Sequence, residues 1–393
     1  MRYGAWVAVL ALCLSIQAGA GELEGEVSEL RRQVALLTAR LDDLERGEVS
    51  PVREAAVSAV PRKASGDGRI RIKGDFRYRH DYIDVEGLST RNRQRVRARI
   101  GVLADVREDV QAGLQLASGP SSPRTTNQTL GNAASTKDIG LDLAYVTWQS
   151  PIVGLAFTGG KFKNPLHRPA PLVWDSDVNP EGIAVHYGRG EFFATAMAFW
   201  TVERSSADDS FMIGGQLGWQ HAFDGGPEVL LGTSFYEYTD IKGATPLFDG
   251  NPRGNSVDAA GNYLFDFRQL EVFGEVDLGS VGVPLSLFGQ YVKNTEAGSL
   301  DQAFAVGARG SPLERLALAY TYRDVDADAV LGIFTDSDFG VGFTDVSGHT
   351  FESSVDITDG VAVKLTYFKS ETGDSTGSGT DVDRVFLDFT FKY

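Results

Sequence analysis

Arginines occupy every second position in the stretch 91-RNRQRVRARIGVL-103, from Arg91 to Arg99. Residues two apart share a face on a β-strand but not on a helix. The stretch is therefore predicted to be a strand with one cationic face and one apolar face. The apolar positions between and after the arginines are Val96, Ala98, Ile100, Val102, Ala104 and Val106. A strand of this kind fits either a sheet that buries its apolar side or an arginine-rich segment that binds nucleic acid.

The charge of the whole chain argues against nucleic acid. The formal net charge is -16 at pH 7. A protein that binds nucleic acid needs a broad basic surface to displace counterions from the phosphates. The arginines form a local basic patch in an acidic chain, so nucleic acid is not an expected partner.

The first twenty residues have the features of a secretory signal peptide. Arg2 supplies the basic region, residues 5–16 the apolar core, and 18-AGA-20 the small residues of a cleavage site. The apolar run is too short to span a bilayer. The only cysteine, Cys13, follows Leu12, where lipoprotein processing needs a small residue. We therefore expect an exported chain without a lipid anchor and without disulfides.

Residues 22–46 carry a heptad pattern. The apolar residues alternate spacings of four and three, at Leu23, Val27, Leu30, Val34, Leu37, Leu41 and Leu44. This pattern predicts a short coiled coil, and an amphipathic helix packed on its own domain is the alternative. The β-branched residues in the seam favour a dimer. Three heptads are marginally stable alone, so the partner chains must also be held together elsewhere. Residues 47–68 are predicted to be a linker.

The long remainder, residues 69–393, is predicted to be entirely β. It contains repeated stretches of about ten residues with alternating polar and apolar positions, the pattern of membrane-spanning strands. In chain order these stretches are 69–83, 92–106, 109–118, 138–149, 153–162, 181–188, 191–203, 210–222, 228–239, 264–278, 283–294, 300–310, 313–325, 346–357, 360–371 and 382–393. Short and long connections alternate between them, as expected of a barrel with tight turns at one end and long loops at the other.

The last stretch, 382-VDRVFLDFTFKY-393, alternates apolar and polar residues, with Phe386 as the one exception. It ends in the aromatic Tyr393, which resembles the signal by which the barrel-assembly machinery recognises outer-membrane proteins. A membrane sheet must close because no backbone polar group can stay unpaired in hydrocarbon. The prediction is a transmembrane antiparallel barrel of about sixteen strands, with an aqueous lumen. The arginines then face water inside, and the interleaved apolar residues face lipid.

Three stretches carry a resemblance to a known family: 159-GGKFKNPLHRP-169, 174-WDSDVNPEG-182 and 334-FTDSDFGVGFTD-345. With the barrel pattern, they resemble the putative porin family of the bacterial outer membrane, in which a coiled coil precedes a sixteen-stranded barrel. The resemblance implies a homotrimer in the outer membrane of a Gram-negative bacterium. It also implies a third long loop, here about 163–180, folded into the lumen. We take this resemblance as a stronger indication than the preference of the coiled coil for a dimer.

The implied function is passive diffusion of small polar or ionic solutes through a charged lumen. The predicted pore-lining residues are Arg71, Lys73, Asp75, Arg77, Arg79, Arg93, Arg95, Arg97 and Arg99. The predicted constriction residues are Asp175, Asp177 and Glu181. A basic wall opposite an acidic loop sets up a field across the pore. Because the arginines outnumber the loop acids, a weak preference for anions is expected.

An enzyme and a structural anchor are the alternative functions. Residues 373-GDSTG-377 match a nucleophile pattern, but they lie in a polar loop without the strand–turn–helix that the pattern requires. The five histidines are scattered, so no catalytic residue and no cofactor is predicted. As an anchor, the barrel would hold the coiled coil in the periplasm, where it could contact peptidoglycan.

Two groups of acidic residues have the composition of possible metal sites. The triplet Asp175, Asp177 and Asn179 begins like a calcium loop, but Pro180 replaces the glycine and His186 replaces the bidentate glutamate. An EF-hand is therefore excluded. A second acidic group lies in another outer loop, at Asp324, Asp326, Asp328, Asp336 and Asp338. Solvation, or contact with lipopolysaccharide bridged by divalent cations, is its predicted role, and bound calcium is the alternative.

Overall fold

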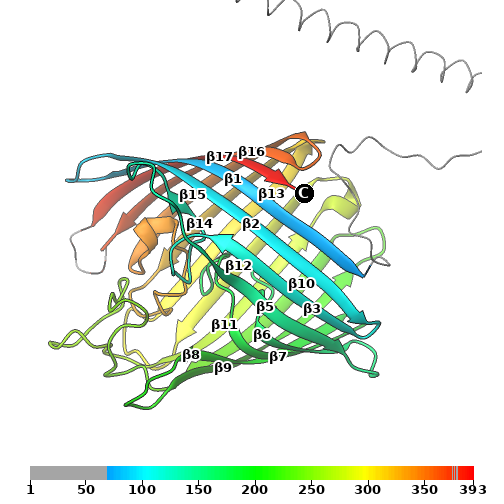
Figure 1. Ribbon diagram of the computed structural model, residues 1–393, viewed down its shortest axis with the longest axis horizontal. Coiled ribbons are helices and arrows are strands. Elements are labelled where there is room, and N and C mark those ends of the chain that lie inside the picture. The colour runs from blue at the N-terminus through cyan, green and yellow to red at the C-terminus, as the bar shows by residue number, and fades with distance from the viewer. Residues whose placement is uncertain (1–68, 374, 376, 378) are drawn as a thin grey trace, which may run out of the picture. The chain divides into compact units, whose positions relative to one another are not determined.

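The computed structural model describes residues 69–393 except 374, 376 and 378. Sixteen strands, β1–β3 and β5–β17, close into one antiparallel barrel (Figure 1). Closure comes from β1 (Ile70–Val85), which pairs with β2 (Arg91–Arg107) on one side and β17 (Thr380–Lys392) on the other. The predicted all-β barrel is confirmed. The predicted signal peptide (1–20), coiled coil (22–46) and linker (47–68) lie outside the described residues.

The strands follow one another around the barrel in chain order. The remaining ones are β3 (Val110–Ser118), β5 (Ile139–Gln149), β6 (Leu155–Lys161), β7 (Glu181–Arg189), β8 (Phe192–Val202), β9 (Ser210–Ala222), β10 (Glu228–Tyr238), β11 (Phe267–Asp277), β12 (Leu285–Asn294), β13 (Gln302–Leu313), β14 (Leu316–Val325), β15 (Val346–Thr358) and β16 (Val361–Thr372). The predicted limits of every strand lie within three residues of these. Alternating side chains and closing turns are local features, which is why the sequence predicts them well.

The connections differ in length at the two ends of the barrel. Short turns such as 108–109, 190–191 and 359–360 lie at one end, together with the first residue of β1 and the last of β17. Long connections lie at the other end, at 119–138, 162–180, 239–266 and 326–345. The first of these contains the two-residue strand β4 (Gln128–Thr129), which pairs with β2. Two short 3-10 helices, η1 (Gly279–Val281) and η2 (Phe339–Gly342), complete the described elements, and neither is long or apolar enough to cross a membrane.

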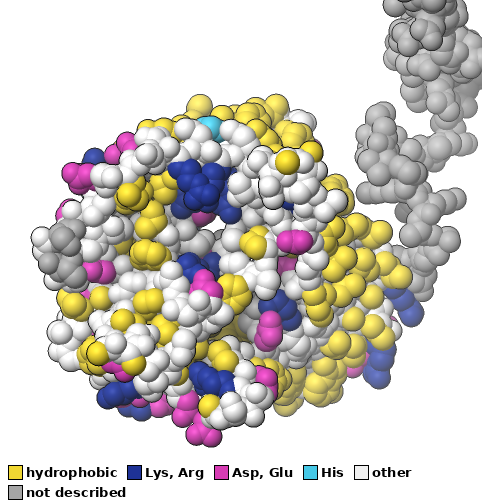
Figure 2. Space-filling model, turned by 60° about the vertical axis from the view of Figure 1, so that its left-hand side comes forward, with side chains coloured by type: hydrophobic (Ala, Val, Ile, Leu, Met, Phe, Trp, Pro, Cys, Tyr) yellow, Lys and Arg dark blue, Asp and Glu magenta, His cyan; other side chains and the backbone are white. Residues whose placement is uncertain are grey.

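The two faces of the wall have opposite character. On β2, Ile100 is 49 % exposed and Val102 36 % exposed on the outer surface, whereas Arg95 is only 7 % exposed because it points inward. Exposed apolar side chains cover the visible outer wall (Figure 2). Such a continuous apolar surface, around a sheet with every strand paired, is that of a transmembrane β-barrel.

Part of the interior is a packed core. The loops 162–180 and 326–345 contribute the fully buried side chains of Leu172, Trp174, Leu331 and Ile333. These pack against inward-facing residues of β8–β12, which include Phe199, Met212, Tyr236, Phe267 and Val292. The Trp174 ring lies 5.6 Å from the ring of Phe199 and 5.7 Å from that of Tyr236. The sequence predicted an aqueous lumen and did not indicate this packed part, because it is formed by loops distant in the chain.

Candidate functional site: a charged wall and three loops

The pairing of β1 with β2 brings cationic side chains face to face. Across the two strands, Arg77 lies opposite Arg97, and Arg79 lies opposite Arg95. Like charges directly opposite each other destabilise a sheet. The two flanking pairs are mixed instead, with Asp75 opposite Arg99 and Asp81 opposite Arg93. The wall therefore needs carboxylates from other elements.

The charged residues of the wall and loops form two groups. In the first group, the numbers of positive and negative side chains are equal. Asp75 accepts hydrogen bonds from Arg97 Nε at 3.0 Å and from Arg99 Nε at 2.6 Å. Asp177, in the loop 162–180, lies 4.0 Å from Arg97 Nη1. Two guanidiniums thus face two carboxylates, and the loop approaches the strand wall at this point.

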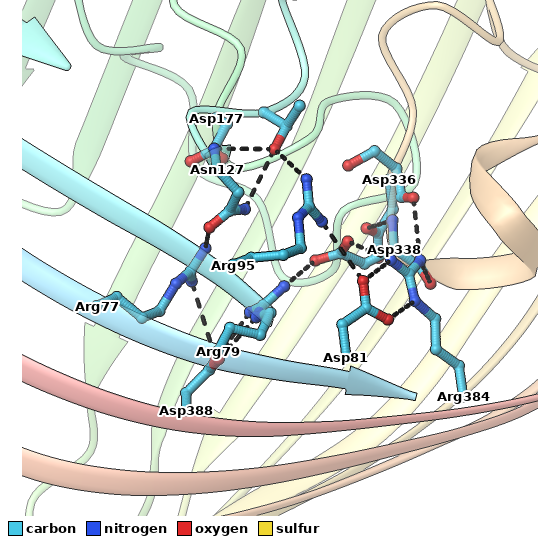
Figure 3. Close-up of polar contacts among 12 residues, drawn as sticks. Arg77, Arg79, Asp81, Arg95, Asn127, Asp177, Asp336, Asp338, Arg384 and Asp388 are labelled. Atoms are coloured by element: carbon cyan, nitrogen blue, oxygen red, sulfur yellow. Dashed lines mark hydrogen bonds and ion pairs between the residues drawn. The ribbon is translucent and has the colours of Figure 1, made fainter. Parts of the chain in front are cut away.

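The second group, which we call the arginine network, joins five arginines to three aspartates. Figure 3 labels all of its members except Arg93. Its members are Arg77, Arg79, Arg93, Arg95 and Arg384, with Asp81, Asp338 and Asp388. Arg79 binds Asp388 in a bidentate manner, at 2.6 and 2.7 Å, and also reaches Asp338 at 3.1 Å. Asp81 accepts hydrogen bonds from Arg93 and from Arg384. These are charge-assisted contacts of the strong kind.

Strand β17 supplies three members of this site that were not among the predicted pore-lining residues. Arg384 and Asp388 point inward, and Phe386 lies between them on the same face. The Phe386 ring is 3.8 Å from the guanidinium carbon of Arg79 and 4.5 Å from that of Arg384. Both are cation–π contacts. The signal was Phe386 itself, the one residue that broke the alternation of the last strand.

A second inward loop, 326–345, meets the loop 162–180 through matching Asp-Ser-Asp sequences. The carboxylate of Asp175 accepts hydrogen bonds from the backbone N–H of Asp177 and of Ser337, both at 2.8 Å. The Thr335 hydroxyl donates to the Leu172 carbonyl at 2.6 Å. The repeated triplet was present in the two stretches 174–182 and 334–345. Sequence alone did not show that the two copies bind each other.

The loops 162–180 and 326–345 each contain a carboxyl group with a shifted pKa, and the two shifts have opposite directions. Burial, and then the neighbouring Asp336 and Asp177, raise the pKa of Asp175 to about 8. Burial acts in the same direction on Asp338, but the guanidiniums of Arg79 and Arg384 prevail and hold the pKa of that carboxyl below its usual value. Asp338 therefore carries a negative charge into the arginine network, whereas Asp175 favours the neutral form.

The loop 119–138 is the third component. Arg124 donates from Nη1 to the carbonyls of Gly332 and Gly342, at 3.2 and 2.7 Å, which joins this loop to 326–345. The Asn127 side-chain oxygen accepts a hydrogen bond from Arg77 Nη2 at 2.7 Å. Arg95 Nη2 donates to the Thr125 hydroxyl at 3.4 Å. Neutral side chains of this loop therefore cover part of the arginine network.

The loop 162–180 is tethered at its other side to strands half-way around the barrel. Gln216 of β9 exchanges two hydrogen bonds with the backbone of His167, at 2.8 and 3.0 Å. The His167 ring lies 2.8 Å from the Glu275 carboxylate, and Gln290 accepts a hydrogen bond from the Ala170 N–H at 3.0 Å. The loop thus crosses the interior from β9–β12 to the arginine-bearing wall.

The remaining predicted residues lie elsewhere. Arg71 pairs with Asp105 at 2.7 Å in an exposed position near the short turns, and Lys73, also exposed, lies two residues along the same strand. Glu181 is the first residue of β7 and pairs with Lys161 at 2.7 Å, exposed to solvent. The structure therefore brings Asp75 and Asp177 together with the predicted arginines from 77 to 99, and Asp175 is buried in the same loop as Asp177. Arg71 and Lys73 lie apart from them, whereas Glu181 lines a cavity together with Asp177.

The end with the long connections is hollowed, and Lys and Arg side chains gather in and around the hollow (Figure 2). A cavity of about 1020 Å³ is lined by residues of the loop 119–138, by Lys161 and by the predicted constriction residues Asp177 and Glu181. A smaller cavity of about 500 Å³ lies beside the short turns and is lined by Asp277, Arg309, Glu352 and Lys364. Both cavities carry charges of both signs.

Within the described residues, no three His, Cys, Asp or Glu side chains are arranged to hold a metal ion. The aspartates predicted to cluster in the loop 326–345 are instead engaged separately, for example Asp336 with Arg323 at 2.6 Å. The 373–377 motif includes residues 374 and 376, which lie outside the described residues.

Comparison with known proteins agrees with the fold. A family model described as "Putative porin" matches residues 84–256 and 315–393. The solved structure of OprB from Pseudomonas putida at high pH is similar, with a TM-score of 0.56 and 14 % identity, over 82 % of this chain and 94 % of that one. OmpF from Salmonella typhi, in complex with daunomycin, gives a TM-score of 0.53 and 12 % identity, over 82 % and 97 % of the two chains. No protein in the curated set is similar enough in sequence to match. The family match covers more than half of the chain, which therefore belongs to the putative porin family and is a porin-like barrel channel.

Proposed function

We propose that the protein is an outer-membrane porin of a Gram-negative bacterium, through which small polar and ionic solutes diffuse passively with a weak preference for anions. The observation that carries this proposal is the inward-facing charged wall of a closed barrel. On it, the arginine network places five guanidiniums against three carboxylates. An aqueous path between low-dielectric walls focuses the field of such groups.

The constriction in this proposal lies between the wall of β1 and β2 and the inward loops 162–180 and 326–345. The approach of Asp177 to Arg97, at 4.0 Å, supports it, as does the ion pair of Asp338 with Arg79. A basic wall would then face acidic loop residues across the path. A solute with separated charges would be oriented as it passes.

The anion preference follows from the charges nearest this path. The chain as a whole is acidic, but charges further than about 8 Å away are largely screened at physiological salt. Local charge then decides selectivity, and the arginines outnumber their partners. The raised pKa of Asp175 lowers the negative charge of the loops further.

The proposed partners follow from the outer surface and from the family. The apolar outer wall fits membrane lipid, with lipopolysaccharide around it. The terminal strand ending in Tyr393 fits recognition by the barrel-assembly machinery. A homotrimer is proposed from the resemblance to porins, and contact of the residues 22–46 with peptidoglycan is proposed from their heptad pattern.

Single-channel recording in planar bilayers tests the proposal. We expect discrete conductance steps, often in groups of three, and a reversal potential under a salt gradient that indicates anion preference. Replacing Arg95, Arg97 and Arg99 with glutamine should move the reversal potential towards cations. The matched control replaces Arg107, Arg189 and Arg315, which are exposed at the short turns, and should leave it unchanged. A folded barrel without conductance would refute the porin function.

A further inference from the structure

We propose that Arg77 and Arg95 form a binding site for a small oxyanion with two negative charges, such as sulfate, phosphate or a short dicarboxylate. The inference deepens the proposed function, because it places a defined solute site on the charged wall. It rests on charge balance, on the distances around these two arginines, and on their burial.

The arginine network contains more positive than negative side chains. The arginine network contains five guanidiniums and three carboxylates, whereas the neighbouring group of Asp75, Asp177, Arg97 and Arg99 is neutral. The network therefore carries two positive charges in excess. Bringing charge of one sign together away from bulk water costs free energy, unless an opposite charge joins it.

The distances locate the surplus on two residues. Arg77 Nη1 is 3.9 Å from Asp388, and Arg95 Nη1 is 3.6 Å from Asp81. Both separations exceed hydrogen-bonding distance. Asp388 already binds Arg79 with both oxygens, and Asp81 already binds Arg93 and Arg384. Among the described residues, no carboxylate is hydrogen-bonded to Arg77 or Arg95.

The two guanidiniums come from neighbouring positions. In the register of β1 and β2, Arg77 and Arg95 are diagonal neighbours on the same face. Diagonal positions are about 7–8 Å apart at the backbone, a separation that long side chains can bridge. Two guanidiniums so placed can bracket one tetrahedral or dicarboxylate anion, since each presents a planar set of N–H donors that matches an oxyanion.

Both arginines also have buried N–H groups without a hydrogen-bond acceptor among the described residues. The side chains of Arg77 and Arg95 are 13 % and 9 % exposed. In both residues the Nε–H is buried without a hydrogen-bond acceptor among the described residues. The other contacts are with the neutral Asn127 and Thr125 of the loop 119–138, which offer polar atoms but no charge. The site thus combines unsatisfied donors with uncompensated positive charge.

The excess of two charges favours a divalent anion over chloride. One dianion would neutralise both guanidiniums at once, whereas a single chloride would leave one uncompensated. Sulfate is a suitable probe because its charge does not change near neutral pH. In single-channel recordings with a chloride background, we expect sulfate to reduce the current of the unmodified protein in a saturable manner.

Variants can distinguish sulfate binding at Arg77 and Arg95 from a non-specific effect of the positive charge of the lumen. The double substitution Arg77→Gln and Arg95→Gln should weaken the sulfate block about tenfold or more, since each lost charge-assisted hydrogen bond is worth about tenfold in affinity. The control Arg91→Gln removes an exposed arginine of the same ladder and should leave the block unchanged. Asn127→Asp places a carboxylate at the position that now accepts from Arg77, so it should also weaken the block without loss of folding.

The outcomes are distinguishable. Equal block in the unmodified protein and in a folded double variant, or no block in a conducting protein, would overturn the site. If the unmodified barrel did not conduct, the porin function would fall, and sulfate binding to the detergent-solubilised protein would be measured by calorimetry instead. Heat released by the unmodified protein but not by the Asn127→Asp variant would still support the site, whereas equal heats would refute it.

Discussion

At the scale of single residues, the charged wall depends on side chains that each contact several partners. Phe386 is the clearest case, because its ring contacts the guanidiniums of both Arg79 and Arg384. Arg79 in turn binds Asp388 and Asp338. The aromatic ring therefore contacts two like-charged side chains, which the Asp338 carboxylate also pairs with.

Replacing Phe386 with leucine should destabilise the barrel by about 1–3 kcal/mol, because both cation–π contacts and part of the buried aromatic surface are lost. The measurement is thermal unfolding in detergent. The control is Phe351→Leu, since that ring is exposed on the outer wall. Equal losses in the two variants would show that the guanidinium contacts do not matter.

Asp175 gives the site a pH dependence. Its pKa is raised to about 8 in the folded protein, against about 3.9 for an unfolded aspartate. Folded Asp175 thus holds its proton more tightly, and the contact between the inward loops weakens as the pH rises from about 4 to about 8. Above about pH 8 the ionised carboxylate lies beside Asp336 and Asp177.

We therefore expect open-channel current noise to increase as the pH rises towards about 8 and to level off above that pH. Asp175→Asn should suppress this increase, because the asparagine cannot ionise. The control is Asp208→Asn, an exposed residue of the connection 203–209, which should keep the pH dependence of the unmodified protein. Noise that does not change with pH would argue against a titrating Asp175.

At the scale of elements, the loop 162–180 is held at both of its sides. One side is bound to β9–β12 through Gln216, Glu275 and Gln290, and the other reaches Arg97 through Asp177. Between these points it packs its aromatic and aliphatic residues against the strands. A loop so attached behaves as a fixed partition of the interior.

Gln216→Ala tests the tether. The substitution leaves the backbone N–H and C=O of His167 without their present partner, at an expected cost of about 1–3 kcal/mol for each group that stays buried and unpaired. We expect lower thermal stability and larger current fluctuations. Gln220→Ala on the same strand is the control, since that side chain is exposed and, among the described residues, its hydrogen bond is to Glu228 at the surface. If the Gln216 variant had the same thermal stability and the same current fluctuations as this control, other contacts would be responsible for holding the loop.

At the scale of the whole molecule, the barrel depends on how its two terminal strands meet. The backbone of Tyr393 exchanges two hydrogen bonds with Gly74, at 3.0 and 3.1 Å. The tyrosine hydroxyl also donates to the Arg99 carbonyl at 3.3 Å. A Cβ atom at position 74 would lie 2.4 Å from this hydroxyl oxygen and 2.3 Å from that carbonyl oxygen, so glycine is required there.

Deletion of Tyr393 should reduce the amount of folded barrel in the outer membrane, because it removes the last closing contacts and the terminal aromatic residue. Tyr393→Phe, which keeps the ring and the backbone, should assemble nearly as well. The measurement is the fraction of protein that migrates as a folded, heat-modifiable species on electrophoresis. Normal assembly after the deletion would exclude a role for this residue.

The sequence by itself determined the number of strands, their limits and which face of each is apolar. These follow from period-two alternation and from turn residues, which are local properties of the chain. It also indicated a basic wall on β1 and β2, because Arg77, Arg79, Arg95 and Arg97 lie on the inner face of two consecutive strands.

Only the tertiary structure decided which charges are paired. Asp388 and Arg384 reach β1 because the last strand closes onto the first, and Asp338 reaches Arg79 from a position 259 residues away. The loop 326–345 binds the loop 162–180 through contacts whose partners are 163 and 162 residues apart in the chain. Electrostatic balance depends on distances in space, and alternation along a strand carries no information about what faces it across the interior. For that reason the surplus charge on Arg77 and Arg95 could be identified only from the folded barrel.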